Sequence, residues 1–203
     1  MDVLTVVIAS LATSIIFAAG TSRLGAIFGL ESANVGIGLG PRLTSAKLGS
    51  MRLEIRPVPI GSFVKFRDPV FGDEYNGINP VFRLSALKAS LVMVGPPLIL
   101  VALAIATLLG TPARAARLGS LVALWTGVSC LLPIPSQNGF ALLQRLRMPA
   151  SKLPEVQGLS SRLKGCSLLA LMAAGLLAFV TLCFNADFAL GILERVVPST
   201  PPN

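Results

Sequence analysis

The sequence predicts an α-helical polytopic membrane protein, with about four transmembrane helices and a small β-hairpin or sheet between the first and the second. Apolar residues make up 53% of the 203 residues and charged residues only 13%, about half of the roughly 25% typical of soluble domains. The apolar residues are also gathered in blocks long enough to cross a bilayer. We therefore expect one membrane domain over 1–203, with predicted spans at 3–22, 89–109, 118–137 and 166–184.

The first two blocks predict the first two transmembrane helices. Val3 to Gly20 carries only Ser and Thr as polar residues, which predicts a first transmembrane helix. A cleavable signal peptide is the alternative, but Asp2 stands where such a peptide has a basic region, and the run exceeds the usual apolar segment. Ala89 to Leu109 contains no charge and provides the roughly 20 residues that a bilayer core requires, although it contains Pro96 and Pro97.

The third block is broken. Leu118 to Ile134 runs into Pro133 and Pro135, and proline removes backbone donors from a helix. Broken backbone at membrane depth must be covered by protein, so we expect this break to face the bundle interior, with Asn138 satisfying the freed backbone groups. Cys166 to Phe184 predicts the fourth span, followed by a short interfacial helix over 188–197.

The segment 34–66 predicts extended structure. Arg52 to Arg56 alternates polar and apolar residues as a half-covered strand does, and Gly49-Ser50 is a turn signal after the stretch 41–48. A further short strand is predicted over 63–66. A small sheet or re-entrant hairpin lying against the helices fits these residues.

The basic surplus predicts orientation rather than a nucleic-acid partner. The formal net charge is +8, but only one Trp and one Tyr are available for stacking on bases, so we exclude nucleic acid. Fourteen of the 17 basic residues lie between the first and second or the third and fourth spans. The positive-inside rule then places both termini on the outer, periplasmic side, and we expect a bacterial inner-membrane protein.

Residue types that are scarce exclude several chemistries. The chain has no histidine, which removes His-ligated zinc, Ser-His-Asp and Cys-His sites. The cysteines Cys130, Cys166 and Cys183 lack C-x-x-C spacing and are interpreted as small core residues. No metal and no cofactor are expected.

Four motifs in order give the chain a family resemblance. G-I-G-L-G-P after the first helix, P-V-P-I-G-S-F-V-K, V-G-P-P and L-L-P-I-P-S-Q-N-G resemble the motifs of the site-2 proteases, the intramembrane zinc metalloproteases. The alternative is that such Gly and Pro pairs are the turn and helix-break residues common in membrane proteins, without any family relationship. The resemblance is carried by Gly36, Gly38, Gly40, Pro41, Pro59, Gly61, Lys65, Gly95, Pro96, Pro133, Pro135 and Gly139.

The resemblance also implies that the catalytic residues are missing. In the family, H-E-x-x-H on the first core helix holds zinc and activates water, and an aspartate in the third motif completes the ligand set. In this chain Phe17 and Thr21 stand at the histidine places, Ala18 at the glutamate place and Asn138 at the aspartate place. The protein is therefore expected not to be an enzyme.

A site-2-protease-like core without zinc ligands predicts an interaction role. We expect a structural or regulatory subunit of a larger complex with other integral membrane proteins in the lipid bilayer. The alternative is a non-cleaving binder of transmembrane client segments, with a client strand added at Phe63, Val64, Lys65 and Phe66. A transporter is disfavoured because no charge falls inside 89–109, 118–134 or 166–184. An active protease that takes its ligands from a partner chain is also disfavoured.

Overall fold

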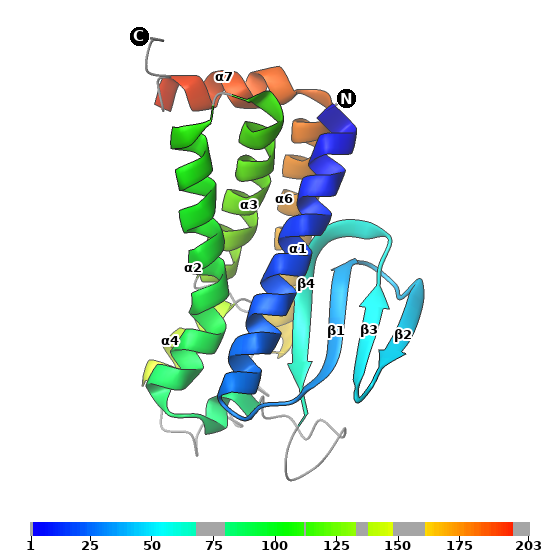
Figure 1. The fold of residues 1–203 in the computed structure, drawn as a ribbon, viewed down its shortest axis with the longest axis vertical. Helices are drawn as coiled ribbons and strands as arrows, with labels where there is room; N and C mark the ends of the chain where they lie inside the picture. Colours follow the sequence, from blue (N-terminus) through cyan, green and yellow to red (C-terminus); the bar gives the residue numbers. More distant parts are fainter. Residues whose placement is uncertain (1, 68–79, 112, 133–137, 148–160, 197–203) are drawn as a thin grey trace.

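The computed structural model describes residues 2–67, 80–111, 113–132, 138–147 and 161–196. This part of the chain is mostly helical and carries one four-stranded mixed sheet beside the helices (Figure 1). The helices are α1 (Asp2–Ile27), α2 (Ala86–Gly110), α3 (Arg114–Leu131), α4 (Asn138–Arg147), α6 (Ser161–Phe184) and α7 (Ala186–Val196), with a short 3₁₀ helix η1 at Pro80–Arg83.

Two of the described helices, α1 and α2, are long and apolar enough to cross a membrane. They contain the first two predicted spans. The segments Ala173–Phe184 and Ala186–Arg195 meet at 97° and count as a third span only if the bent pair is taken as one. Helix α3 ends at Leu131, whereas the predicted third span continued to 137, outside the described residues. Two or three spans are thus supported, and four remain a prediction.

Helix α1 ends in a glycine-dependent turn that sends the chain back along the helix. Gly29 has a φ of 81°, a left-handed conformation that favours glycine. The Leu30 N–H donates to the Gly25 carbonyl at 2.9 Å and the Gly29 N–H to the Ala26 carbonyl at 3.0 Å, the pair of bonds of a Schellman motif. The first strand begins two residues later, beside α1.

The predicted sheet is confirmed, with more strands than expected. Its strands are β1 (Ser32–Leu39), β2 (Thr44–Leu48), β3 (Met51–Ile55) and β4 (Val58–Phe66), in the order β2-β3-β1-β4. Strand β1 is parallel to β3 and antiparallel to β4, and β2 and β3 form a hairpin. Strand β1 was not predicted, because its glycines hide the alternation that marks a strand.

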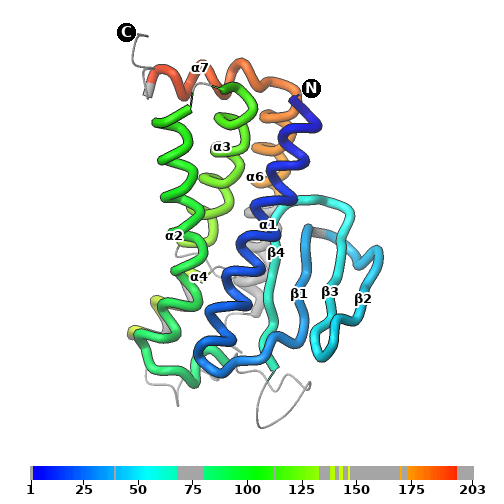
Figure 2. The backbone as a smooth tube through the Cα atoms, in the orientation of Figure 1, coloured from blue at the N-terminus to red at the C-terminus, as the bar shows by residue number. Residues whose placement is uncertain are grey.

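The sheet lies beside the C-terminal half of α1, with β4 nearest to the helix (Figures 1 and 2). The Ser10 hydroxyl donates to the Pro59 carbonyl near the start of β4, and Phe66 at its end lies against Gly25. Fifteen helical residues separate Ser10 from Gly25, a rise of roughly 22 Å. The sheet therefore lies along α1 from Ser10 to Gly25.

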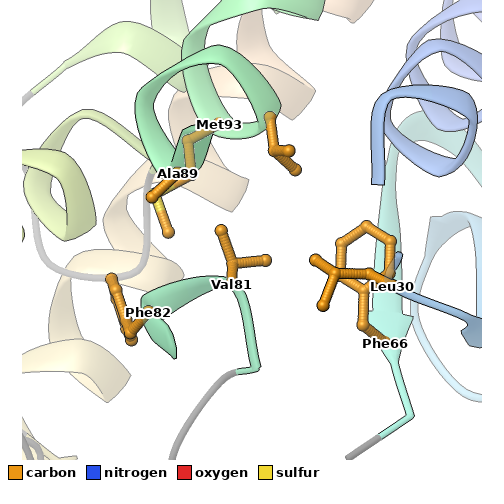
Figure 3. Close-up of a cluster of buried hydrophobic side chains, with 7 residues drawn as sticks. Leu30, Phe66, Val81, Phe82, Ala89 and Met93 are labelled. Carbon is orange, nitrogen blue, oxygen red and sulfur yellow. The ribbon is translucent and has the colours of Figure 1, made fainter. Parts of the chain in front are cut away.

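One apolar cluster joins the sheet to α2. Figure 3 shows Val81 of η1 between Leu30 and Phe66 on one side and Ala89 and Met93 of α2 on the other. Val64 of β4 packs against the same cluster. One face of the sheet is therefore turned toward the helices. The full cluster consists of Leu30, Phe66, Val81, Phe82, Ala89, Val92 and Met93.

A second cluster closes the opposite end of the bundle, where α7 lies across the helix ends near the start of α1 (Figure 2). Its members are Val6, Leu118, Val122, Leu182, Cys183, Ala186 and Leu190. The predicted interfacial helix thus corresponds to α7, which buries one face and exposes Phe188 and Ile192.

Ion pairs fasten α7 to the other helices. The Arg114 guanidinium donates to Asp2 at 2.8 Å and to Asp187 at 2.6 Å, which links the first residues of α1, α3 and α7. Arg117, which is buried, reaches Glu194 at 3.3 Å. The N-terminal end of α1 and helix α7 therefore share one end of the bundle.

Candidate functional site

The residues that the resemblance aligns with the H-E-x-x-H motif lie on the buried side of α1. Phe17, Ala18 and Thr21 are all buried on α1. The Thr21 hydroxyl donates to the Phe17 carbonyl one turn earlier, at 2.9 Å, so its polar group is used within the helix. A Cβ at Gly20 would lie 3.6 Å from the Pro96 side chain, which places this segment against α2.

Asn138 links α4 to the proline pair of α2. Its side-chain Nδ2 donates to the Met93 carbonyl at 2.8 Å. In an α-helix this carbonyl would accept from the N–H of residue 97, which is a proline and has none. Asn138 therefore supplies the donor that Pro97 lacks. This partner is on α2, and the expected role of Asn138 at the Pro133–Pro135 break falls outside the described residues.

Small residues let the helices meet closely at the same place. A Cβ at Gly127 of α3 would lie 2.7 Å from Val101 and 2.9 Å from the Pro97 carbonyl oxygen, so this contact requires glycine. Gly139 of α4 likewise lies directly on the Leu131 carbonyl. At Gly95 an added Cβ would be 3.2 Å from Leu24. Residues of α1, α3 and α4 therefore lie against the segment of α2 that contains Pro96 and Pro97.

The glycine motif of β1 serves the sheet. Gly36 is paired with Phe63 across the strands, and the Phe63 ring lies where a side chain at Gly36 would be. Gly38 and Gly40 have φ values of 92° and 102°, at the irregular end of β1, whereas Gly61 has a φ of 76° within β4. Pro41 is exposed in the turn that follows β1.

The predicted client strand lies in β4, an edge strand of the sheet. Phe63, Val64 and Lys65 pair with β1, and Phe66 is buried in the core. The other side of β4 faces α1. In the described part of the chain the open strand edge is that of β2, whose five residues are all exposed.

The sheet face turned away from the core cluster carries a polar network that was not predicted. Asn34 Nδ2 donates to Glu54 Oε1 at 2.9 Å, and Arg56 Nη2 donates to Glu54 Oε2 at 3.3 Å. Arg56 also lies over the Phe63 ring, 4.6 Å from its centroid. Alternation placed Glu54 on a polar face, but its partners are Asn34 on the neighbouring strand β1 and Arg56 directly after β3.

Glu54 is expected to make stability depend on pH. The Asn34 hydrogen bond and, after it, the Arg56 guanidinium hold the pKa of Glu54 below its usual value. A carboxyl with a lowered folded-state pKa stabilises the fold above its unfolded pKa and loses this contribution as the pH falls through the folded value. Melting temperature in detergent should therefore decline below about pH 4.5, and Glu54→Gln should flatten that decline. An unchanged profile in Glu54→Gln would contradict the role of this carboxyl. Glu31→Gln, which alters an exposed carboxyl, is the control.

Within the described ranges, no three His, Cys, Asp or Glu side chains lie close enough to hold a metal ion together. Comparisons with protein-family models and with curated proteins gave no match.

Proposed function

We propose that this chain is a catalytically inactive site-2-protease-like protein with four membrane spans, which acts as a structural or regulatory subunit of a larger membrane complex. The observation that carries the proposal is that the side chains at the positions of the family's catalytic residues stabilise the fold. Phe17, Ala18 and Thr21 pack into the bundle, and Asn138 completes the hydrogen bonding of α2. Side chains that serve packing and hydrogen bonding at these positions support a structural role rather than a catalytic one.

The outer face of α2 supports an assembly role. Ala102 and Ala106 are exposed one turn apart, whereas Ala104 is buried in the bundle. Small residues spaced by four permit close approach of another transmembrane helix. We propose that a partner helix contacts α2 there.

A pull-down of the tagged full chain from native membranes in mild detergent tests this role. We expect a defined set of integral membrane proteins in stoichiometric amounts, without zinc, identified by mass spectrometry and metal analysis. Ala102→Leu/Ala106→Leu should reduce their recovery at least about fivefold, since bulky residues prevent close helix contact.

The matched control changes two exposed alanines of α1, Ala12→Leu/Ala26→Leu, and should leave recovery unchanged. Recovery of the chain alone, or zinc at about one ion per chain, would contradict the subunit role. Equal loss in both variants would contradict a contact on α2.

The open edge of β2 favours the second candidate, a non-cleaving binder of client segments. An extended segment could add to Thr44–Leu48 as a fifth strand. A photocrosslinker at Ala46 should then capture a client peptide, whereas capture at Phe63 is not expected because β4 is already paired.

A further inference from the structure

A row of cations crosses the whole sheet on the face that carries Glu54. Lys47 of β2 is paired with Arg52 of β3, Arg52 with Asn34 of β1, and Asn34 with Lys65 of β4. Residues paired in this way point to the same face of a sheet. Four strands spaced by about 4.8 Å place the outer two cations roughly 14 Å apart. We call Lys47, Arg52 and Lys65 the cation row.

The cation row lies at the level where α1 leaves its apolar part. Lys65 precedes Phe66, whose ring lies against Gly25, two residues beyond the exposed Arg23. The strands run along the direction of α1 (Figures 1 and 2), so a row across the strands runs across the helix axis. In a bilayer crossed by α1, the row is therefore parallel to the membrane plane and at headgroup depth.

Within the described residues, no acidic side chain is paired with the cation row. The nearby acids are engaged elsewhere, Glu54 with Arg56 at 3.3 Å and Glu31 with Arg67 at 3.2 Å. Lys47 and Arg52 are directly opposite each other, and like charges in that position destabilise a sheet unless an anion lies between them.

We propose that the cation row binds the phosphate groups of anionic phospholipids in the leaflet that surrounds the end of α1. The occupant follows from charge and position: three cations in a line, at headgroup depth, facing away from the protein core. The bound lipid holds the end of the sheet that carries the row at the level of the headgroups. This role does not depend on the subunit function proposed above.

Lipid selectivity of the full chain in vesicles tests the proposal. The protein is reconstituted in phosphatidylcholine with one fifth phosphatidylglycerol, and spin-labelled forms of the two lipids report their relative association with the protein. Each cation near an anionic surface contributes about fivefold to binding. Lys47→Gln/Arg52→Gln should therefore lower the preference for phosphatidylglycerol about tenfold or more, and raising NaCl to about 0.5 M should lower it in the unmodified protein.

The control variant removes the same charge elsewhere. Arg42 lies before β2, at the opposite end of the strands, and Arg195 lies on α7. Arg42→Gln/Arg195→Gln should change the preference less than twofold. An unchanged preference in the row variant, or equal losses in both variants, would overturn the proposal. A row variant that keeps its lipid preference but loses its protein partners would overturn it in favour of an acidic protein segment.

Discussion

Replacing Gly25 by leucine is expected to lower the free energy of unfolding by about 3 kcal/mol, because a side chain there enters space that the Phe66 ring occupies. The ring belongs to the cluster that joins β4, η1 and α2, so its displacement disturbs all three. Leucine has a higher helix propensity than glycine, by about 1 kcal/mol or less. This gain is smaller than the cost of overpacking. The measurement is the unfolding transition in mild detergent.

The control for this variant is Gly191→Leu on α7, where an added Cβ meets nothing within 4 Å. It should be neutral or slightly stabilising. A second substitution, Phe66→Ala, should restore part of the stability of Gly25→Leu, because the leucine then fills the space of the ring. If Gly25→Leu were as stable as Gly191→Leu, the close contact between α1 and β4 would be wrong.

Replacing Asn138 by alanine is expected to cost about 1 to 3 kcal/mol, because the Met93 carbonyl then lacks a donor inside the protein. Asn138→Asp should be at least as destabilising near neutral pH, since an ionised carboxylate keeps the shape of the amide but cannot donate. Melting in detergent at fixed protein concentration measures both variants.

A double-mutant cycle with Pro97→Ala isolates this hydrogen bond. Alanine at position 97 restores the backbone N–H that donates to the Met93 carbonyl within α2. In that background Asn138→Ala should cost less than about 0.5 kcal/mol. Additive losses would show that Asn138 stabilises the protein by another route, and the explanation through Pro97 would be abandoned.

Hydropathy, alternation and turn residues predicted the helices and strands whose formation depends on residues close by in the sequence. Hydropathy blocks located α1 and α2, because an uncharged run of about 20 residues has few other stable environments. Alternation located β3, and the Gly49-Ser50 turn located the hairpin with β2. Strand β1 was missed because its glycines hide the alternation of polar and apolar residues. Gly36 pairs with Phe63, which lies 27 positions later in the sequence, so the local pattern does not show this pairing.

The role of Asn138 could not be read from its neighbours. The nearby Pro133 and Pro135 suggested a partner within the same break, which falls outside the described residues. The structure adds a partner that was not predicted, a carbonyl 45 positions away on α2. The cation row also depends on contacts between residues that are distant in the sequence. Lys47, Arg52 and Lys65 are scattered in the sequence and become a line through strand order and register alone.

Composition and hydropathy were sufficient for two conclusions about this protein: it has apolar helices long enough to cross a membrane, and it has no histidine to bind zinc. Both depend on which groups the chain contains, and folding cannot change that. The burial of Phe17 and Thr21, the partner of Asn138 and the alignment of the cations required the folded chain. Contacts between distant segments depend on how loops return the chain, and no local pattern of residues specifies that geometry.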